Sequence, residues 1–258
     1  MTRETLQIIC FSPTGGTEKV LKAVASGLSS EPVFHDLCVA APGPEITLGP
    51  EETALIGMPV FAGRVPPFAA EALRRFHGNN RPAVLVVVYG NRDYEDALIE
   101  LRDLAESRGF APVAAGAFIA EHSLVRSIAA RRPDAKDRAK AQCFGEAAAR
   151  KIAGLPVGAA VPLEVKGNRP YRDLPPGLLN PYAGKGCNDC GTCAAACPAG
   201  AVPEAEPHRT DPAKCICCCR CIRVCPQKAR RFKRPVLAAL KARLLPLCAA
   251  RKEPEIFL

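Results

Sequence analysis

Eight of the fourteen cysteines form two copies of one spacing in the last third of the chain. The first copy reads Cys187-x2-Cys190-x2-Cys193-x3-Cys197, and the second reads Cys215-x2-Cys218-x2-Cys221-x3-Cys225. A proline follows the last cysteine of each copy. Steps of three residues let one tight loop present three thiolates, and soft thiolates are the preferred ligands of iron–sulfur clusters. The repeat therefore indicates metal chemistry, with the fourth ligand of each site supplied from elsewhere.

The double run resembles the ligand pattern of bacterial two-cluster ferredoxins, in which the fourth cysteine of each run binds the other cluster. The resemblance implies two [4Fe-4S] clusters and one-electron transfer at low potential. Crossing the ligands gives one site made by Cys187, Cys190, Cys193 and Cys225, and a second made by Cys215, Cys218, Cys221 and Cys197. The alternatives are a pair of zinc sites, for which four ligands in two pairs suffice, or a disulfide-rich module.

The remaining cysteines receive no role. A register starting at Cys217 would place Arg220 at the next ligand position, so Cys217 and Cys219 are interpreted as bystanders. Isolated cysteines usually behave as small buried apolar residues. This applies to Cys10, Cys38, Cys143 and Cys248.

The elements upstream of the cysteines alternate between short apolar runs and helical patterns. Strands are expected at residues 5–11, 33–37, 53–57, 83–89 and 113–119, and helices at 16–29, 68–76, 94–107 and 133–152, the last with Pro133 near its first turn. This alternation predicts an α/β fold, a doubly wound five-stranded parallel sheet. Ligands of such sheets bind at the carboxyl ends of the strands.

A glycine-containing loop follows the first expected strand. It contains Ser12, Thr14, Gly15, Gly16 and Thr17, and it opens directly into a helix. Glycines let backbone amides approach a ligand, and a helix N-terminus attracts anions. The three hydroxyl groups can donate to phosphate oxygens, whereas the loop has no Lys or Arg and is not a Walker loop. The alternative is a capped helix start with Thr14 as the N-cap.

Three loops at the same sheet edge resemble those of flavodoxins: the Ser-x-Thr-Gly-x-Thr loop, Met58–Arg64 after the third strand, and Tyr89–Tyr94 after the fourth. With the cysteine repeat, nearly the whole chain resembles flavodoxin–ferredoxin fusion proteins, including the stretch Ala120–Ser123. The resemblance implies one FMN. Its contact residues would be Ser12, Thr14, Gly15, Gly16, Thr17, Pro59, Val60, Phe61, Ala62, Gly63, Tyr89, Gly90, Asn91 and Tyr94.

Several of these residues carry specific expectations. Phe61 and Tyr94, or Tyr89, would stack on the flavin, unless Tyr89 is a core residue at the end of its strand. Gly63 would act as a hinge for a carbonyl that turns toward the flavin N5. Arg64 would approach the flavin or lie on the surface. The chain lacks the tryptophan and the acidic flavin-loop run of ordinary flavodoxins.

His122 follows the fifth expected strand, within Glu121-His122-Ser123. A histidine there is a candidate proton relay to the reduced flavin near neutral pH. The Ser-His pair also invites comparison with hydrolases, but no nucleophile-elbow motif is present. A loop hydrogen bond or a contact between domains is the alternative interpretation.

The formal charge of +9 is confined to the second part of the chain. Eight cysteinates and bound cofactors would partly neutralise this excess, and no nucleic-acid motif is present, so nucleic-acid binding is not expected. The sequence has no run of 18 apolar residues, so no transmembrane helix is expected, and no N-terminal signal is recognisable. Free thiolates favour a reducing, cytoplasmic compartment.

The expected organisation is a flavodoxin-like FMN domain (1–154), a Pro-rich connector (155–180), a small α+β two-cluster ferredoxin domain (181–234), and a C-terminal helix and tail (235–258). Alternating Val161, Leu163 and Val165 predict that the connector lies over the flavin domain. The basic helix at residues 235–250 is expected to dock on the protein itself rather than on a membrane.

Together these features predict an electron-transfer protein that passes low-potential electrons between two [4Fe-4S] clusters and FMN. Two alternatives stay open: an FMN-dependent reductase of a small substrate fed by the clusters, and a ferredoxin whose flavodoxin-like domain is an empty docking surface. The partner would be a redox protein or a small-molecule acceptor. The sequence predicts neither the donor nor the oligomeric state.

Overall fold

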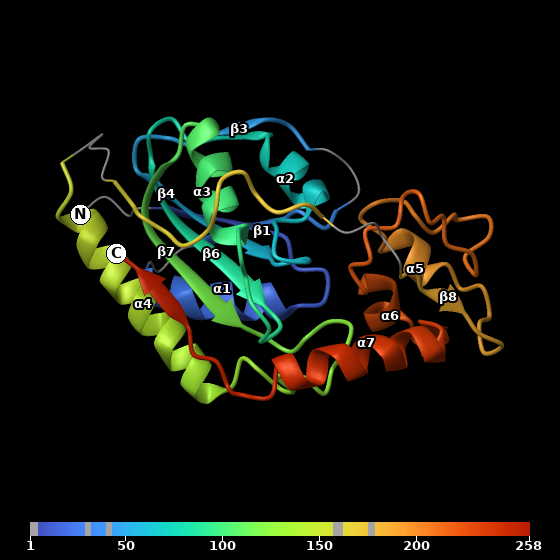
Figure 1. The fold of residues 1–258 in the computed structure, drawn as a ribbon. Helices are drawn as coiled ribbons and strands as arrows, with labels where there is room; N and C mark the ends of the chain where they lie inside the picture. The colour runs from blue at the N-terminus through green and yellow to red at the C-terminus, as the bar shows by residue number, and fades with distance from the viewer. Residues whose placement is uncertain (1–4, 29–31, 40–42, 157–161, 175–178) are drawn as a thin grey trace.

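The computed structural model describes residues 5–28, 32–39, 43–156, 162–174 and 179–258. Residues 5–156 contain an α/β unit, and residues 179–233 contain a smaller cysteine-rich unit beside it (Figure 1). The final helix and tail run from the cysteine-rich unit back to the α/β unit, so the chain crosses between the two units twice.

The centre of the α/β unit is a sheet with the strand order β10-β7-β6-β4-β1-β2. Five strands are parallel: β1 (Thr5–Cys10), β2 (Pro32–Asp36), β4 (Glu52–Pro59), β6 (Pro82–Tyr89) and β7 (Ala111–Ile119). Their order is the 2-1-3-4-5 order of flavodoxin-like sheets, which confirms the predicted doubly wound fold. A separate parallel pair of two-residue strands, β3 (Ile46–Thr47) and β5 (Phe76–His77), lies outside this sheet.

Helices cover both faces of the sheet because its central strands are apolar on both sides. Along β6, Val84, Val86 and Val88 face the core shared with α1 (Gly16–Leu28) and α4 (Ala135–Ala153). Leu85 and Val87 face the opposite core, shared with α2 (Pro67–Leu73) and α3 (Ala97–Ser107). The unbroken apolar run of β6 is therefore explained by burial on both faces.

Helices α1 and α4 pack closely because a glycine lies at the contact on each of them. A Cβ on Gly27 would lie 2.3 Å from the Gln142 carbonyl oxygen, and one on Gly145 would lie 2.1 Å from that of Val24. Helix α4 begins at a capping box formed by Asp134 and Asp137. Pro133 therefore precedes the N-cap instead of lying in the first turn, which corrects the sequence expectation.

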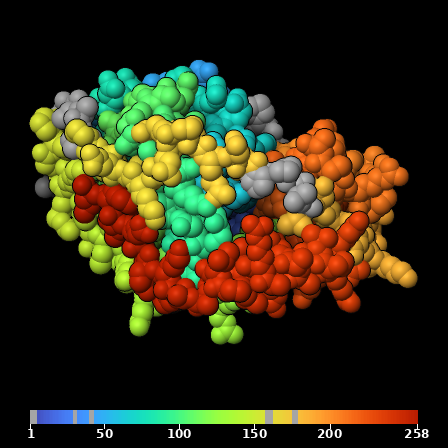
Figure 2. Space-filling model, in the orientation of Figure 1, coloured from blue at the N-terminus to red at the C-terminus, as the bar shows by residue number. Residues whose placement is uncertain are grey.

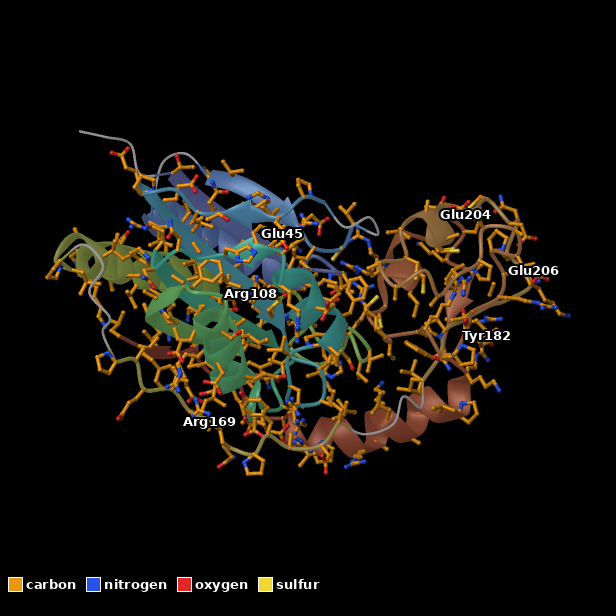
Figure 3. All side chains as sticks on the ribbon, turned by 90° about the horizontal axis from the view of Figure 1, so that it is seen from above. Glu45, Arg108, Arg169, Tyr182, Glu204 and Glu206 are labelled. Carbon is orange, nitrogen blue, oxygen red and sulfur yellow. The ribbon has the colours of Figure 1, made fainter. Side chains whose placement is uncertain are left out.

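The cysteine-rich unit is built from two short helices and one short strand pair. Helix α5 (Thr192–Ala195) and helix α6 (Arg220–Val224) pack together, and β8 (Tyr182–Ala183) pairs with β9 (Arg230–Arg231). Cys193, Val202 and Cys221 belong to its small buried core. On the side turned away from the α/β unit lie Tyr182, Glu204 and Glu206 (Figure 3).

Residues 162–174 of the connector lie along α3. Leu163 is buried in the core of the α/β unit, and the Asp96 carboxylate accepts hydrogen bonds from the amides of Asn168 and Arg172, each at 2.8 Å. Tyr171 donates to Asp103. This agrees with a connector laid over the first unit, although Val161, Pro175 and Pro176 fall outside the described residues.

The C-terminal segment corrects the expected strand count. Helix α7 (Arg234–Leu247) continues through Pro246 and packs on Val125 and Ile128 of the α/β unit. The tail then forms β10 (Glu255–Phe257), which pairs antiparallel with β7 and makes a sheet of six strands instead of five. In Figure 2, α7 and the tail (red) form a continuous band along both units. No helix among the described residues is long and apolar enough to cross a membrane.

Candidate cofactor sites

The structure gathers the eight repeat cysteines around two separate cavities. The first cysteine cavity is lined by Cys187, Cys190, Cys193 and Cys225. The second cysteine cavity is lined by Cys197, Cys215, Cys218 and Cys221, with Cys219 beside them. Each cavity thus combines three cysteines of one run with the fourth cysteine of the other run. Cys217 does not line either cavity.

The two halves of this unit repeat the same backbone geometry. Helices α5 and α6 both start after a left-handed N-cap residue, Gly191 at φ 73° and Cys219 at φ 65°. Four residues after the last cysteine of each run, a backbone amide donates to its sulfur: Ala201 to Cys197 at 3.2 Å and Ala229 to Cys225 at 3.3 Å. Amide donors can stabilise negative charge on a sulfur, and the fourth cysteine of each run receives one such donor.

Each cysteine set has the four thiols that one iron–sulfur cluster needs. Within the described part of the chain, no group of three or more His, Cys, Asp or Glu residues is arranged to hold one metal ion. Four thiolates around one zinc ion lie about 4 Å apart, because Zn–S bonds are about 2.3 Å long and tetrahedral. The four thiolates of an iron–sulfur cube lie farther apart, because each one binds a different iron atom at a corner of the cube.

The loop after β1 presents free amides at the start of α1. Ser12 accepts a hydrogen bond from the Glu18 amide at 2.9 Å, so Ser12 caps the helix rather than Thr14. Gly15 has φ 83°, a conformation that favours glycine. Among the described residues, no acceptor takes the amides of Thr14, Gly16 or Thr17. These donors, the Thr14 and Thr17 hydroxyls and the helix N-terminus form a cradle that fits a phosphate group.

The loop after β4 is a tight turn closed by two hydrogen bonds between Phe61 and Arg64, at 2.9 and 3.1 Å. Its central residues are Ala62 and Gly63, both with positive φ. The Gly63 carbonyl accepts from the Asp96 amide at 3.0 Å, so rotation of that carbonyl requires breaking a bond. The Ala62 carbonyl has no such partner among the described residues and is the freer one to turn.

Arg64 does not lie free on the surface. Its guanidinium group forms a bidentate ion pair with the buried Glu100, at 2.7 and 2.8 Å, and donates to the Arg172 carbonyl at 2.6 Å. The guanidinium also stacks over the Tyr171 ring at 4.7 Å. Arg64 therefore fastens the connector to α3, which corrects the expectation that it lies on the surface.

The loop after β6 is enclosed in the protein. Tyr89 is 3% exposed and Tyr94 is 1% exposed, and the Tyr94 hydroxyl donates to Glu255 of the tail at 2.6 Å. Neither ring presents a face to a ligand at the sheet edge in this arrangement. The expected stacking role is therefore left to Phe61, which is half-buried.

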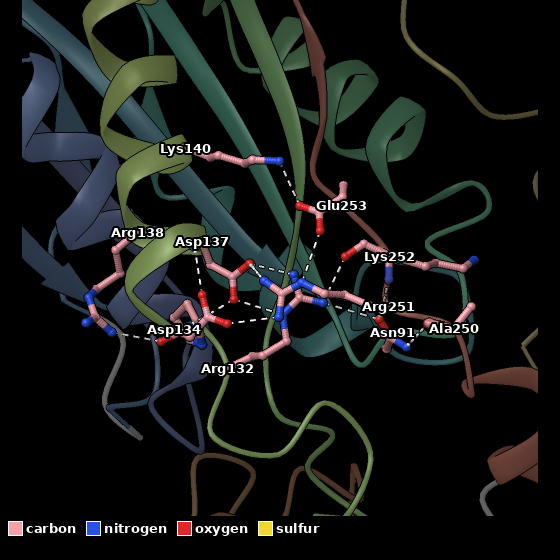
Figure 4. A network of polar contacts seen from close by, with 11 residues as sticks. Asn91, Arg132, Asp134, Asp137, Arg138, Lys140, Ala250, Arg251, Lys252 and Glu253 are labelled. Carbon is pink, nitrogen blue, oxygen red and sulfur yellow. Dashed lines mark hydrogen bonds and ion pairs between the residues drawn. The ribbon is translucent and has the colours of Figure 1, made fainter.

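Asn91 holds the C-terminal tail (Figure 4). Its amide nitrogen donates to the carbonyls of Cys248 and Ala250 at 2.9 and 2.8 Å, and its oxygen accepts from the Lys252 amide at 3.2 Å. A network of ion pairs and hydrogen bonds lies next to Asn91. The sequence does not predict it, because its residues come from segments that lie far apart in the chain. In it Arg132, which is 7% exposed, pairs with Asp137 and donates to the Lys252 carbonyl, and Arg251 pairs with the same Asp137.

His122 is held as a neutral ring against Gly90. Its Nδ1 accepts from the amides of Leu124 and Val125 at 3.2 Å, which leaves the proton on Nε2. Burial, with the charge of Arg92 adding to it, lowers the pKa of His122 to about 4. Proton exchange near neutral pH does not match this environment, so the relay expectation is replaced by a loop-ordering role.

The second cysteine cavity lies on the side of its unit that faces the sheet edge. Ile216, which lines this cavity, packs against the core of the α/β unit. Arg220 of α6 lines it too and lies 3.9 Å from Asp36 at the end of β2. Close by, burial and the charge of Asp36 raise the pKa of the Cys38 thiol to about 12. Asp36 ends β2 and the phosphate cradle follows the parallel neighbour β1, so this cavity and the cradle lie toward the same edge of the sheet.

Comparisons with known proteins match the α/β unit alone. No family profile and no curated protein matches the sequence. Similar solved structures include a flavodoxin from the domain Archaea, at 13% identity over 58% of this chain and 99% of that chain, with a TM-score of 0.40. A WrbA-like flavodoxin from Agrobacterium tumefaciens has 17% identity over 58% and 98%, with a TM-score of 0.38. Rubredoxin oxygen:oxidoreductase from Desulfovibrio gigas has 16% identity over 58% and 36%, with a TM-score of 0.41. At scores of this size the fold assignment rests on the strand order of the chain itself.

Proposed function

We propose that this chain is an electron-transfer protein that carries two [4Fe-4S] clusters in the cysteine-rich unit and one FMN at the carboxyl edge of the sheet. The observation that carries the proposal is the crossed lining of the two cysteine cavities. Three cysteines of one run and the fourth of the other meet at each cavity, as the ligand pattern of two-cluster ferredoxins requires. When bound, the clusters supply one-electron chemistry and FMN supplies one- or two-electron chemistry.

The chain's own residues would hold the groups in the following way. The two cysteine sets would be the ligands, and the Ala201 and Ala229 amides would stabilise the charge on Cys197 and Cys225. The amides of Gly16 and Thr17, with the Thr14 hydroxyl, would bind the FMN phosphate. Val60, Phe61 and Gly90 would border the flavin, with His122 ordering the loop behind Gly90.

The proposal places the second cysteine cavity on the path between the first cavity and the flavin. Ile216 and Arg220 belong to the lining of that cavity and also reach the α/β unit. The connector on α3 and the tail on β7 hold the two units together from opposite ends. This double attachment supports electron transfer within one chain over transfer between separate molecules.

The test is the composition of the full-length protein purified without oxygen. The proposal requires about eight iron and eight sulfide per chain and one FMN, with absorption from both kinds of group. Protein with full iron and no flavin would instead support a ferredoxin whose α/β unit is an empty docking surface. Turnover of a small substrate, beyond simple electron exchange, would instead support the FMN-dependent reductase.

A further inference from the structure

Arg230 is a charged residue inside the cysteine-rich unit. It lies in β9, is 3% exposed, and lines the first cysteine cavity together with Cys187, Cys190, Cys193 and Cys225. Its neighbour Arg231 is exposed to solvent. A fully buried arginine beside a ligand set needs an explanation, because buried charges are costly unless they are paired.

The contacts of the Arg230 guanidinium group anchor it without neutralising it. One terminal nitrogen donates to the Thr210 hydroxyl at 2.5 Å, and the other donates to the Arg209 carbonyl at 2.7 Å and to the Pro207 carbonyl. The first nitrogen also lies 3.5 Å from the Pro181 carbonyl oxygen. The Nε is buried and has no hydrogen-bond partner, and no ion pair joins Arg230 to a carboxylate among the described residues. The group is therefore fixed in place, still carries an uncompensated charge, and keeps one donor to offer.

The internal repeat shows that the fold does not require an arginine here. Cys197 is followed by Pro-Ala-Gly-Ala-Val202, and Cys225 is followed by Pro-Gln-Lys-Ala-Arg230. The alanine before each of these residues donates to the sulfur of its cysteine, so Val202 and Arg230 occupy matching positions. Val202 is 4% exposed and packs in the apolar core of the unit. A valine suffices in one half, whereas the other half carries a buried cation.

The charge of Arg230 also reaches the second ligand set. The Thr210 hydroxyl and the Pro181 carbonyl, which both accept from one terminal nitrogen of Arg230, line the second cysteine cavity. Arg230 itself lines the first cysteine cavity. Arg230 therefore lies between the two cavities.

We propose that Arg230 is the counter-charge for both iron–sulfur clusters, and that its Nε donates a hydrogen bond to the cluster, or a ligand sulfur, in the first cysteine cavity. The inference rests on the proposed function. A cluster bound by four thiolates is negatively charged, and one-electron reduction adds one more negative charge. A fixed cation in a buried site favours the more negative state, so Arg230 raises both reduction potentials. The effect is larger at the first cavity, where the hydrogen bond adds to the charge.

The experiment is a potentiometric titration of the full-length holoprotein followed by electron paramagnetic resonance. In Arg230→Gln the amide retains donors for the carbonyls but has no charge. We expect both potentials to fall, and the first-cavity reduction equilibrium to weaken at least tenfold, which is about 59 mV for one electron. Arg230→Lys retains the charge and loses Nε, so only the first-cavity potential should fall. The signal that is lost in Cys197→Ala identifies the second cavity.

Arg231→Gln is the matched control, because it removes one exposed arginine at the next position. This substitution should change the reduction equilibrium of each cluster less than threefold. Wild-type potentials in an iron-replete Arg230→Gln protein would overturn the inference, as would equal shifts in Arg230→Gln and Arg231→Gln. Loss of iron from Arg230→Gln but not from Arg230→Lys would support a counter-charge, whereas loss from both would make Arg230 purely structural and overturn it. Wild-type protein without iron would overturn the proposed function itself, and this inference with it.

Discussion

The fourth cysteine of each run lines the cavity of the other run. Cys197 follows α5 in the chain but lines the cavity of Cys215, Cys218 and Cys221. Replacing Cys197 with alanine should therefore abolish the second cluster and leave the first. Iron and sulfide should fall to about half, with one paramagnetic signal lost. Cys217→Ser is the control, because Cys217 does not line either cavity, and its iron content should equal that of the wild type. Selective loss of the first cluster would contradict the crossed assignment.

The phosphate cradle makes a separate prediction at the residue scale. The double substitution Thr14→Val and Thr17→Val preserves shape and removes two hydroxyl donors. Hydrogen bonds to charged groups contribute about 1.5–3 kcal/mol each, so the loss of two should weaken FMN binding at least a hundredfold. Flavin fluorescence titration of the FMN-depleted protein measures this. Ser26→Ala is the control, because its hydroxyl donates only to the Ala23 carbonyl of the same helix. Equal FMN affinity in the double variant would rule out this loop as the phosphate site.

His122 links one side chain to the pH dependence of folding. Its pKa is lowered to about 4 in the folded protein, below the ordinary value near 6.5. As the pH falls, the unfolded chain therefore binds this proton before the folded protein does. The unfolding free energy is highest above pH 6.5 and decreases as the pH falls from 6.5 toward 4. Between pH 6.5 and pH 5 this group should account for about 2 kcal/mol of the loss in unfolding free energy.

The measurement for His122 is denaturant unfolding at several pH values in wild type and His122→Gln. The variant should lose less stability than the wild type over the pH range from 6.5 to 5, by about 2 kcal/mol. Its stability at pH 7 does not enter the comparison, since only the slope is tested. Parallel curves for the two proteins would show that His122 already titrates normally in the folded state.

At the scale of elements, the C-terminal tail is part of the α/β unit. Strand β10 extends the sheet beside β7, and Asn91 binds the tail at three points upstream of that strand. Asn91→Ala should therefore release β10 while leaving the five parallel strands paired. Removing these buried bonds should cost about 2 kcal/mol, so amide exchange at Ile256 and Phe257 should speed up more than tenfold.

The control for the tail is Ser107→Ala, which removes an exposed hydroxyl bonded within α3. Its exchange pattern in β10 should match the wild type. Amides in β6, at the centre of the sheet, should exchange slowly in all three proteins. A change spread evenly over every strand in Asn91→Ala would mean that the tail and sheet unfold as one unit.

At the scale of the whole molecule, sequence reasoning succeeds where the signal is local. The cysteine spacing predicts that three cysteines of one run lie together at each cavity, because they share one loop, whereas their role as cluster ligands stays a prediction. The apolar run of β6 predicts a strand buried on both faces. It fails where distant segments meet. Nothing around Asn91 or Tyr94 in the sequence announces partners in the tail, which lies more than 150 positions away. Strand β10 has only three residues, too few for a periodic pattern.

The double crossing of the chain has a kinetic consequence for the intact protein. The connector fastens to Asp96, the tail fastens to Asn91, and Arg220 reaches toward Asp36 at the edge that would hold the flavin. Electrons that enter at the clusters should then reach the flavin inside one chain. After rapid mixing with a limiting reductant, the rate of flavin reduction by the clusters should be the same at all protein concentrations.

The same measurement on Asn91→Ala shows which attachment sets the rate. That variant loosens the tail and leaves the connector contacts of Asp96 and the Arg220–Asp36 contact unchanged. If these contacts position the second cysteine cavity, the rate should stay within about threefold of the wild type and remain independent of concentration. A wild-type rate that rises in proportion to protein concentration would mean that electrons pass between molecules. The contact of Ile216 and Arg220 with the α/β unit would then be structural only.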